Sequence, residues 1–277
     1  MSSISYTKSI ITEKIILSDI KLKYLIVIPC VNREERNAIN VIDKTFAGFE
    51  KSGLFTSDIL VDILLFESGS QNVDYLNFLK EYITKYPNIK IGVIYSSFKL
   101  DGNSNTERMF VTLTKSEYQK YNFVIWMDDD IFVCKNFIKN ADAWIKRYAN
   151  YSLFSSLYVP YDSFFIKNRK YVKHANMPGF YGTCCTVFKP TLARFVLPFW
   201  NDSHFRQFNY NPDARFRDCL RKYFPNIKKI CVSFPSLVDH MNIGSAINMQ
   251  KNVKFGHKAR FFIGEDKDPE FYLKPDL

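Results

Sequence analysis

The 277-residue sequence predicts a single α/β domain in which helices flank a mostly parallel, doubly wound sheet. Apolar runs of strand character alternate with helix-like segments through the first half of the chain, which is the pattern of a parallel sheet. Polar clusters directly follow three of these runs. Hydrophobic residues make up 47% of the chain and charged residues 24%, so the chain is globular and long enough to bury a large core.

Strands and helices are expected to alternate through the first half. The first strand, 24–30, is continuously apolar, as expected when both faces of a strand are buried. A polar stretch follows it, and a helix then runs to Phe49. The second helix is stopped by Pro87-Asn88, and Asp101-Gly102-Asn103 marks a turn before the third. The remaining elements expected here are strands at 58–66, 89–95 and 123–127 and helices at 73–86 and 106–120.

The pattern becomes mixed in the second half. A loop rich in aromatic and basic residues is expected at 160–180. An amphipathic helix is expected at 214–224, because Phe216, Leu220 and Phe224 recur on one stripe. The segment after Gln250 is polar and basic, and we predict a mobile tail. The other elements expected here are helices at 137–148 and after Pro190, and strands at 153–159, 182–188 and 230–234.

Charge and cysteine content narrow the range of functions. The net charge of +10 would attract nucleic acid, anionic lipid or phosphorylated small molecules, although a solvated basic face is the simpler explanation. The six cysteines include no C-x-x-C pair, so a structural zinc site is not expected and a reducing compartment is favoured. There is no run of about 18 apolar residues, and the first twenty residues do not resemble a secretory signal. We therefore expect a cytoplasmic protein.

Three adjacent carboxylates, Asp128, Asp129 and Asp130, stand between two apolar runs of strand character. Their charges repel one another, so the cluster is tolerable only when it is exposed to water or neutralised by a cation. Mg²⁺ and Mn²⁺ prefer carboxylate oxygen. The triplet is therefore a candidate metal site, and a solvated acidic turn is the alternative.

The polar clusters at the strand ends are expected to converge. Asn32-Arg33, Glu67-Ser68 and the triplet each follow a strand. The carboxyl ends of parallel strands meet at one edge of the sheet, where such folds bind ligands. The sequence has neither a G-x-G-x-x-G nor a G-x-x-x-x-G-K-[ST] motif, which disfavours dehydrogenases and P-loop proteins. Phosphate bound here would need another charge partner, and a metal held by carboxylates would serve.

Residues 22–248 resemble the GT-A-fold, nucleotide-sugar-dependent glycosyltransferases. The resemblance rests on the Asp-x-Asp motif at a strand end and on the order of the residues around it, which are Pro29, Arg33, Glu67, Arg108, Asp128, Asp129, Asp130, His240, Gly244 and Ser245. It implies a GT-A (Rossmann-like) sheet, with a leader at 1–21, a nucleotide-sugar-binding half at 22–135, an acceptor-binding half at 136–248 and a tail at 249–277.

The resemblance also implies roles for individual residues. Asp130 is the expected metal ligand, with Asp128 and His240 completing the set for Mn²⁺ or Mg²⁺. A structural role is the alternative for His240, and Asp239 is then the alternative ligand. The remaining residues are expected to contact the donor: Asp128 and Asp129 at the ribose or sugar, Glu67 at the base, Arg33 and Arg108 at the phosphates or base, Pro29 at the first strand end, and Gly244 and Ser245 at the diphosphate.

An inverting transferase needs a base to deprotonate the acceptor hydroxyl. Asp213 opens the amphipathic helix at a position similar to the acidic base of inverting family members. Pro212-Asp213 stands where the family usually shows Glu-Asp, so the match is partial. Asp213 as a helix N-cap is the structural alternative. Asp218 is the second candidate base, and a retaining mechanism follows if neither residue serves.

The sequence thus predicts a metal-dependent glycosyltransferase that moves a sugar, with a UDP-sugar favoured, to a glycan, glycoprotein or glycolipid hydroxyl. The basic surface is compatible with a peripheral membrane contact, and no nucleic-acid partner is expected. One alternative is a sugar-phosphate nucleotidyltransferase, although the glycine-rich loop of that class is missing. The other is a basic nucleic-acid-binding domain, although no RNP-like or helix-turn-helix pattern is present.

Overall fold

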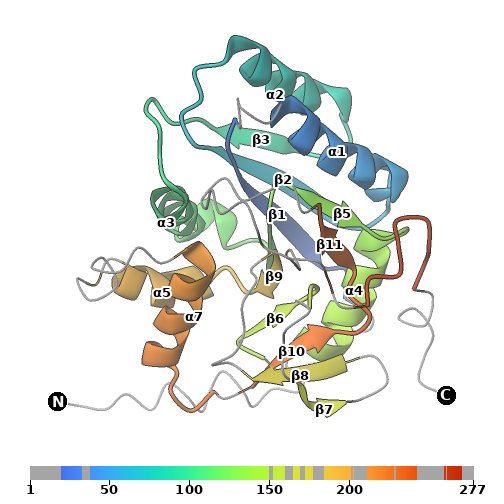
Figure 1. Ribbon diagram of the computed structural model, residues 1–277, viewed down its shortest axis with the longest axis vertical. Helices are drawn as coiled ribbons and strands as arrows, with labels where there is room; N and C mark the ends of the chain where they lie inside the picture. Colours follow the sequence, from blue (N-terminus) through green and yellow to red (C-terminus); the bar gives the residue numbers. More distant parts are fainter. Residues whose placement is uncertain are drawn as a thin grey trace, which may run out of the picture.

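A nine-stranded sheet in the order β3-β2-β1-β4-β9-β6-β10-β8-β7 forms the centre of the protein (Figure 1). The computed structural model describes residues 20–32, 38–149, 152–159, 165–168, 172–176, 184–200, 202, 211–227, 229–241, 259 and 261–269. Seven of the nine strands run in one direction, and only β8 and β9 run against them. The mostly parallel α/β fold predicted from the sequence is thereby confirmed.

The first half of the chain builds the parallel part of the sheet. Its strands are β1 (Lys23–Cys30), β2 (Leu60–Glu67), β3 (Ile91–Ile94) and β4 (Phe123–Met127). The chain returns between them through α1 (Ala38–Lys51), α2 (Val73–Lys85) and α3 (Gly102–Leu113). The order β3-β2-β1-β4 reverses direction at β1, between β2 and β4. Ligand sites in doubly wound sheets lie outside the strand ends at such a switch point.

The second half completes the sheet and adds a separate ribbon. It contributes β6 (Phe154–Ser156), β7 (Phe165–Asn168), β8 (Val172–Asn176), β9 (Cys185–Phe188) and β10 (Lys229–Ser233). A two-stranded antiparallel ribbon is made by β5 (Ile131–Val133) and β11 (Val238–His240). The helices of this half are α4 (Phe137–Tyr148), α5 (Leu192–Trp200) and α7 (Pro212–Tyr223).

Two hydrophobic cores sandwich the sheet. Successive side chains of a strand point to opposite faces. In β1, Tyr24, Ile26 and Ile28 therefore join one core with α1, α2 and α4, while Leu25 and Val27 join the other with α3, α5 and α7. Figure 1 shows α1 and α2 on one side of the parallel strands and α3 on the other. The result is a three-layer helix–sheet–helix arrangement.

Several elements differ from the sequence-based expectations. The segment 160–180 was expected to be a loop, but it contains β7 and β8. The short β11 was not predicted, and the helix expected at 106–120 instead spans Gly102–Leu113. These strands are three to five residues long, too short for a period of two to stand out.

Two further findings concern the cysteines and the length of the helices. All six cysteines are free and buried. No helix in the described part of the chain has both the length and the apolar character needed to cross a membrane.

Candidate functional site

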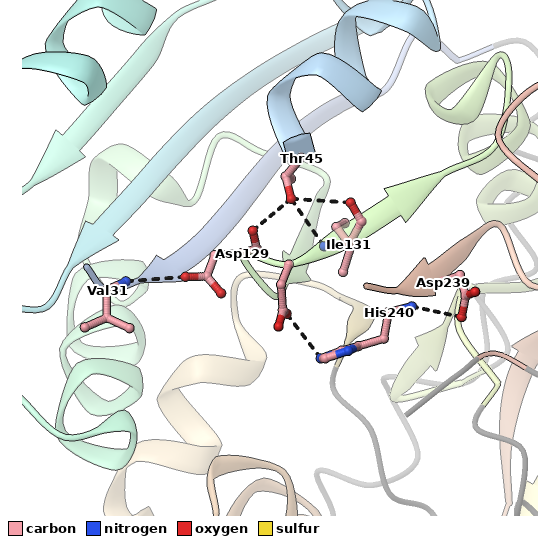
Figure 2. A network of polar contacts seen from close by, with 7 residues as sticks. Val31, Thr45, Asp129, Ile131, Asp239 and His240 are labelled. Carbon is pink, nitrogen blue, oxygen red and sulfur yellow. Dashed lines mark hydrogen bonds and ion pairs between the residues drawn. The ribbon is translucent and has the colours of Figure 1, made fainter. Parts of the chain in front are cut away.

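The acidic triplet is the turn that carries the chain from β4 in the main sheet to β5 in the ribbon. The Asp128 N–H donates to the carbonyl oxygen of Cys184 at 3.2 Å. The hydroxyl of Thr45, on α1, donates to the Asp129 carbonyl oxygen at 2.8 Å and accepts the N–H of Ile131 at 3.2 Å (Figure 2). The turn is thus fixed by hydrogen bonds from both sides. Thr45 was not predicted as a site residue, because in the sequence it is only a polar residue on an apolar helix face.

Asp128, Asp130 and His240 form a cluster that can hold a metal ion. Each offers one ligand atom, and these three atoms lie within 4.8 Å of one another. The His240 Nε2 atom is 3.1 Å from Asp130 Oδ1. The Met241 N–H donates to the Asp130 carbonyl oxygen at 2.8 Å, which keeps the end of β11 beside the triplet. Two carboxylates and an imidazole fit Mn²⁺ or Mg²⁺.

The electrostatics of the cluster also call for a cation. Burial, followed by the negative charges of Asp213 and Asp130, raises the pKa of Asp128 to about 8, and His240 acts in the opposite direction. Burial and nearby negative charge disfavour ionisation of this carboxyl group, and a bound cation would favour it. The residues present therefore fit a divalent cation by donor type and by charge.

Asp128→Asn is expected to stabilise the metal-free protein at pH 8. A carboxyl group whose pKa is raised by folding contributes stability that is fully present below its unfolded pKa and is lost as the pH rises through its folded pKa. The melting-temperature difference between variant and wild type should therefore grow between about pH 5 and pH 8. The expected growth is about 2–4 °C for each kcal/mol of difference in the free energy of unfolding. Thermal melts in EDTA across this range check it. A difference that does not change with pH would contradict the raised pKa of this carboxyl group.

The charge of Asp213 acts on this cluster, since it is second only to burial among the causes of the raised Asp128 pKa. It stands in the first turn of α7. The N-cap of that helix is Asn211, whose side chain accepts the N–H of Ala214 at 2.9 Å, so Asp213 is not the cap. Asp218 lies five residues further along α7 and pairs with arginines of the same helix, Arg217 at 2.9 Å and Arg221 at 3.5 Å.

Glu67 is completely buried and orders the turn after β2. Its Oε2 accepts the N–H of Gly69 at 2.9 Å and its Oε1 accepts the N–H of Ser70 at 2.8 Å. The Arg108 guanidinium donates to the Glu67 carbonyl oxygen at 2.5 Å and to Asn105 Oδ1 at 2.7 Å. Burial lowers the pKa of Arg108 and the charge of Glu67 opposes this. Glu67 and Arg108 therefore lie side by side, and the Glu67 carboxylate is hydrogen-bonded to the backbone of the loop after β2.

Gly69→Ala is expected to lower the free energy of unfolding by about 2 kcal/mol or more. Gly69 has φ +87°, and a Cβ atom there would lie 2.0 Å from the carbonyl oxygen of Phe98. Gly53→Ala is a matched control, because Gly53 has φ +74° but an added Cβ would meet nothing nearer than 3.7 Å. Urea unfolding of both variants isolates the backbone clash. Equal losses would show that the approach of the two loops is not tight.

Asp129 points toward the end of β1 rather than toward the cluster of ligands. Its Oδ2 accepts the N–H of Val31 at 3.4 Å, and the side chain is buried (Figure 2). Burial, followed by the charge of Asp129, raises the pKa of the Cys30 thiol. The charge of Glu67 raises this pKa further, and the charge of Arg108 lowers it. Asp129, Glu67 and Arg108 therefore surround the ends of β1 and β2. Pro29 is half-buried in β1, paired in register with Phe66 of β2.

The structure thus brings most of the predicted site residues to one edge of the sheet. Asp128, Asp130, His240 and Asp213 lie together, and Asp129, Glu67 and Arg108 lie around the neighbouring strand ends. Three further predicted contacts, Arg33, Gly244 and Ser245, fall outside the described residues.

Comparisons with known proteins bear on the fold. No protein-family model matches the sequence, and no curated protein matches it. Solved structures similar to the chain include GalNAc-T7 with UDP, GalNAc and Mn²⁺, at a TM-score of 0.54 and 13% identity over 80% of this chain. The chain spans 44% of the length of that protein.

Two other similar structures have lower scores. One is 4-diphosphocytidyl-2C-methyl-D-erythritol synthase from Anaerococcus prevotii, with 13% identity, 78% of this chain and 89% of that chain covered, and a TM-score of 0.45. The other is described as a mannose-1-phosphate geranyltransferase from Thermus thermophilus, with 10% identity, 77% and 73% covered, and a TM-score of 0.45. The fold is therefore a GT-A (Rossmann-like) fold, with an Asp-x-Asp cluster at the carboxyl edge of its parallel strands.

Proposed function

We propose that the protein is a metal-dependent glycosyltransferase that moves a sugar from a nucleotide-sugar donor to a hydroxyl acceptor with inversion. The observation that carries the proposal is the cluster of Asp128, Asp130 and His240, whose ligand atoms lie within 4.8 Å of one another, and the charge of Asp213 acts on Asp128 in this cluster. A candidate base beside a candidate metal site is the arrangement an inverting transfer needs. Both lie at the sheet edge where α/β folds bind ligands.

The residues divide into three tasks in this proposal. Asp128, Asp130 and His240 would hold the cation, which supplies Lewis-acid stabilisation of the departing diphosphate when bound. Asp129, Glu67 and Arg108 shape the strand ends where the nucleotide would lie. Asp213 accepts the proton of the acceptor hydroxyl as that oxygen attacks the anomeric carbon and the bond to the diphosphate breaks.

The first ligands to test follow from the fold relationship. GalNAc-T7, which shares the fold, is described with UDP and Mn²⁺. A UDP-sugar with Mn²⁺ is therefore the leading donor and cofactor, with Mg²⁺ as the second cation. The acceptor class is a glycan, glycoprotein or glycolipid hydroxyl. The net charge of +10 favours anionic partners such as phosphorylated donors.

The experiment is a donor screen with Mn²⁺ that measures which products are released. A glycosyltransferase is expected to release a nucleoside diphosphate slowly from its own donor, even with water as acceptor. A nucleotidyltransferase would instead release pyrophosphate from a nucleoside triphosphate and a sugar phosphate. Pyrophosphate release without nucleoside diphosphate release would overturn the proposal. So would tight, salt-sensitive binding of DNA or RNA with no effect of nucleotides.

A further inference from the structure

The candidate metal ligands from the two halves of the chain are joined by a ribbon of only two short strands. Asp130 directly precedes β5, and His240 ends β11. The ribbon pairs His240 with Ile131. An isolated two-stranded ribbon is marginally stable in water. The relative position of Asp130 and His240 therefore depends on what supports the ribbon from outside.

Asp239 supports the ribbon on the β11 side. Its Oδ1 atom accepts the N–H of His240 at 2.9 Å and the N–H of Ala259 at 2.5 Å. In Figure 2 the Asp239 side chain lies against the backbone of His240, while the His240 ring extends away from Asp239. One carboxylate oxygen thus accepts hydrogen bonds both from His240, a candidate metal ligand, and from Ala259, which lies 20 positions after Asp239 in the chain. We name the described residues 259 and 261–269 the C-terminal strap.

Further contacts anchor the C-terminal strap near the other strand of the ribbon. Asp268 accepts hydrogen bonds from the side-chain nitrogens of Asn136 at 2.6 Å and Asn140 at 2.9 Å. Both asparagines lie at the start of α4, which follows β5 directly. The Phe261 ring meets the edge of Phe234, just after β10, at 4.7 Å between centroids. The strap therefore links β11, through Asp239, to the start of α4 and to the segment just after β10.

We infer that Asp239 is a positioning residue for His240 and that the C-terminal strap, anchored by Asp268, holds the ribbon in the geometry the cation requires. The inference rests on the proposed function, because it takes His240 as a ligand. Residues that orient metal ligands typically change metal affinity by about 10–100-fold when removed. Asp239 acts here through the His240 backbone and not by touching the cation.

The test compares Mn²⁺ affinity in the full chain and its variants by electron paramagnetic resonance of free Mn²⁺. Asp239→Ala is expected to weaken Mn²⁺ binding about tenfold or more. Asp239→Asn keeps an oxygen acceptor and should stay within about threefold of wild type. Asp268→Ala should weaken binding about three- to tenfold, because it frees the strap at its other anchor. Asp266→Ala is the control, since this strap carboxylate is 81% exposed and its ion pair with Lys51 at 2.6 Å lies in solvent, where such pairs contribute little, so the affinity should be unchanged.

A spectroscopic readout separates positioning from a general loss of stability. The nitrogen hyperfine coupling of bound Mn²⁺ reports ligation by an imidazole. It should be absent in His240→Ala, reduced in Asp239→Ala and restored in Asp239→Asn. Should Asp239→Ala fail to fold, Asp268→Ala carries the same expectation. The inference would be overturned if Asp239→Ala had wild-type affinity and wild-type hyperfine coupling. If Asp239→Ala does not fold, the same result in Asp268→Ala would overturn it. Either result would leave the metal site in place. Absence of Mn²⁺ binding in the wild type would overturn the proposed function itself.

Discussion

Asp130→Ala is expected to remove metal-dependent nucleotide binding and to lower turnover at least about 1,000-fold, or about 4 kcal/mol of transition-state stabilisation. Asp130 is buried, and its Oδ1 lies 3.1 Å from His240 Nε2. Alanine leaves only two of the three ligand groups, the Asp128 carboxylate and the His240 imidazole. The fold should persist, because the Thr45 hydroxyl and the Met241 N–H both donate to backbone carbonyl oxygens of the turn, which the substitution leaves in place.

Asp58→Ala provides the control for this experiment. It removes the same charge from an exposed position before β2, at the opposite edge of the sheet. Titrations of UDP and GDP in Mn²⁺, followed by steady-state rates, compare the two variants. Normal turnover in a folded Asp130→Ala protein would contradict the metal assignment. Equal damage in both variants would show that net charge, and not ligation, is responsible.

Asp213→Asn is expected to lower turnover by about 10²–10⁴-fold and to leave donor binding close to wild type. Asparagine has the same shape but cannot take up the acceptor proton. The start of α7 should be unaffected, because its cap is Asn211 and Pro212 occupies the first helical position. Rates at saturating donor, together with donor affinity, separate chemistry from binding.

Asp218→Asn is the matched control on the same helix. Asp218 pairs with Arg217, which is buried, and with Arg221, so its loss should cost about 1–3 kcal/mol of stability and little activity. An active Asp213→Asn with an inactive Asp218→Asn would reverse the base assignment. If both variants are active, the inverting mechanism fails, and retention at the anomeric carbon of the product, read by NMR, would then indicate a retaining enzyme.

The parallel half of the fold was readable from the sequence because its strands are buried on both faces. Continuous apolar runs such as 24–30 and Phe123–Met127 carry that signal, and the structure places them in adjacent strands. The strands β7, β8 and β11 lack it, because they are short and carry polar residues among the apolar ones. Their pairing is decided by tertiary contacts rather than by local pattern.

The candidate site was likewise predictable only in part from the sequence. The position of the triplet at a strand end, and the convergence of strand ends on one edge, follow from topology and were predicted. The approach of Asp213 to Asp128 joins residues far apart in the sequence and needed three-dimensional information. The burial of Glu67 in its own turn also lay outside the reach of the sequence, since it depends on two backbone N–H groups of the loop.

The central claim is that Asp128, Asp130 and His240 make a cation-dependent nucleotide site. Isothermal titration of UDP, GDP and CDP into the wild-type protein, in Mn²⁺ and again in EDTA, tests it most directly. We predict that at least one nucleotide binds in Mn²⁺ and that its affinity falls about tenfold or more in EDTA, as expected when a metal bridges protein and diphosphate. Equal affinity in both buffers, or no binding in either, would contradict the account.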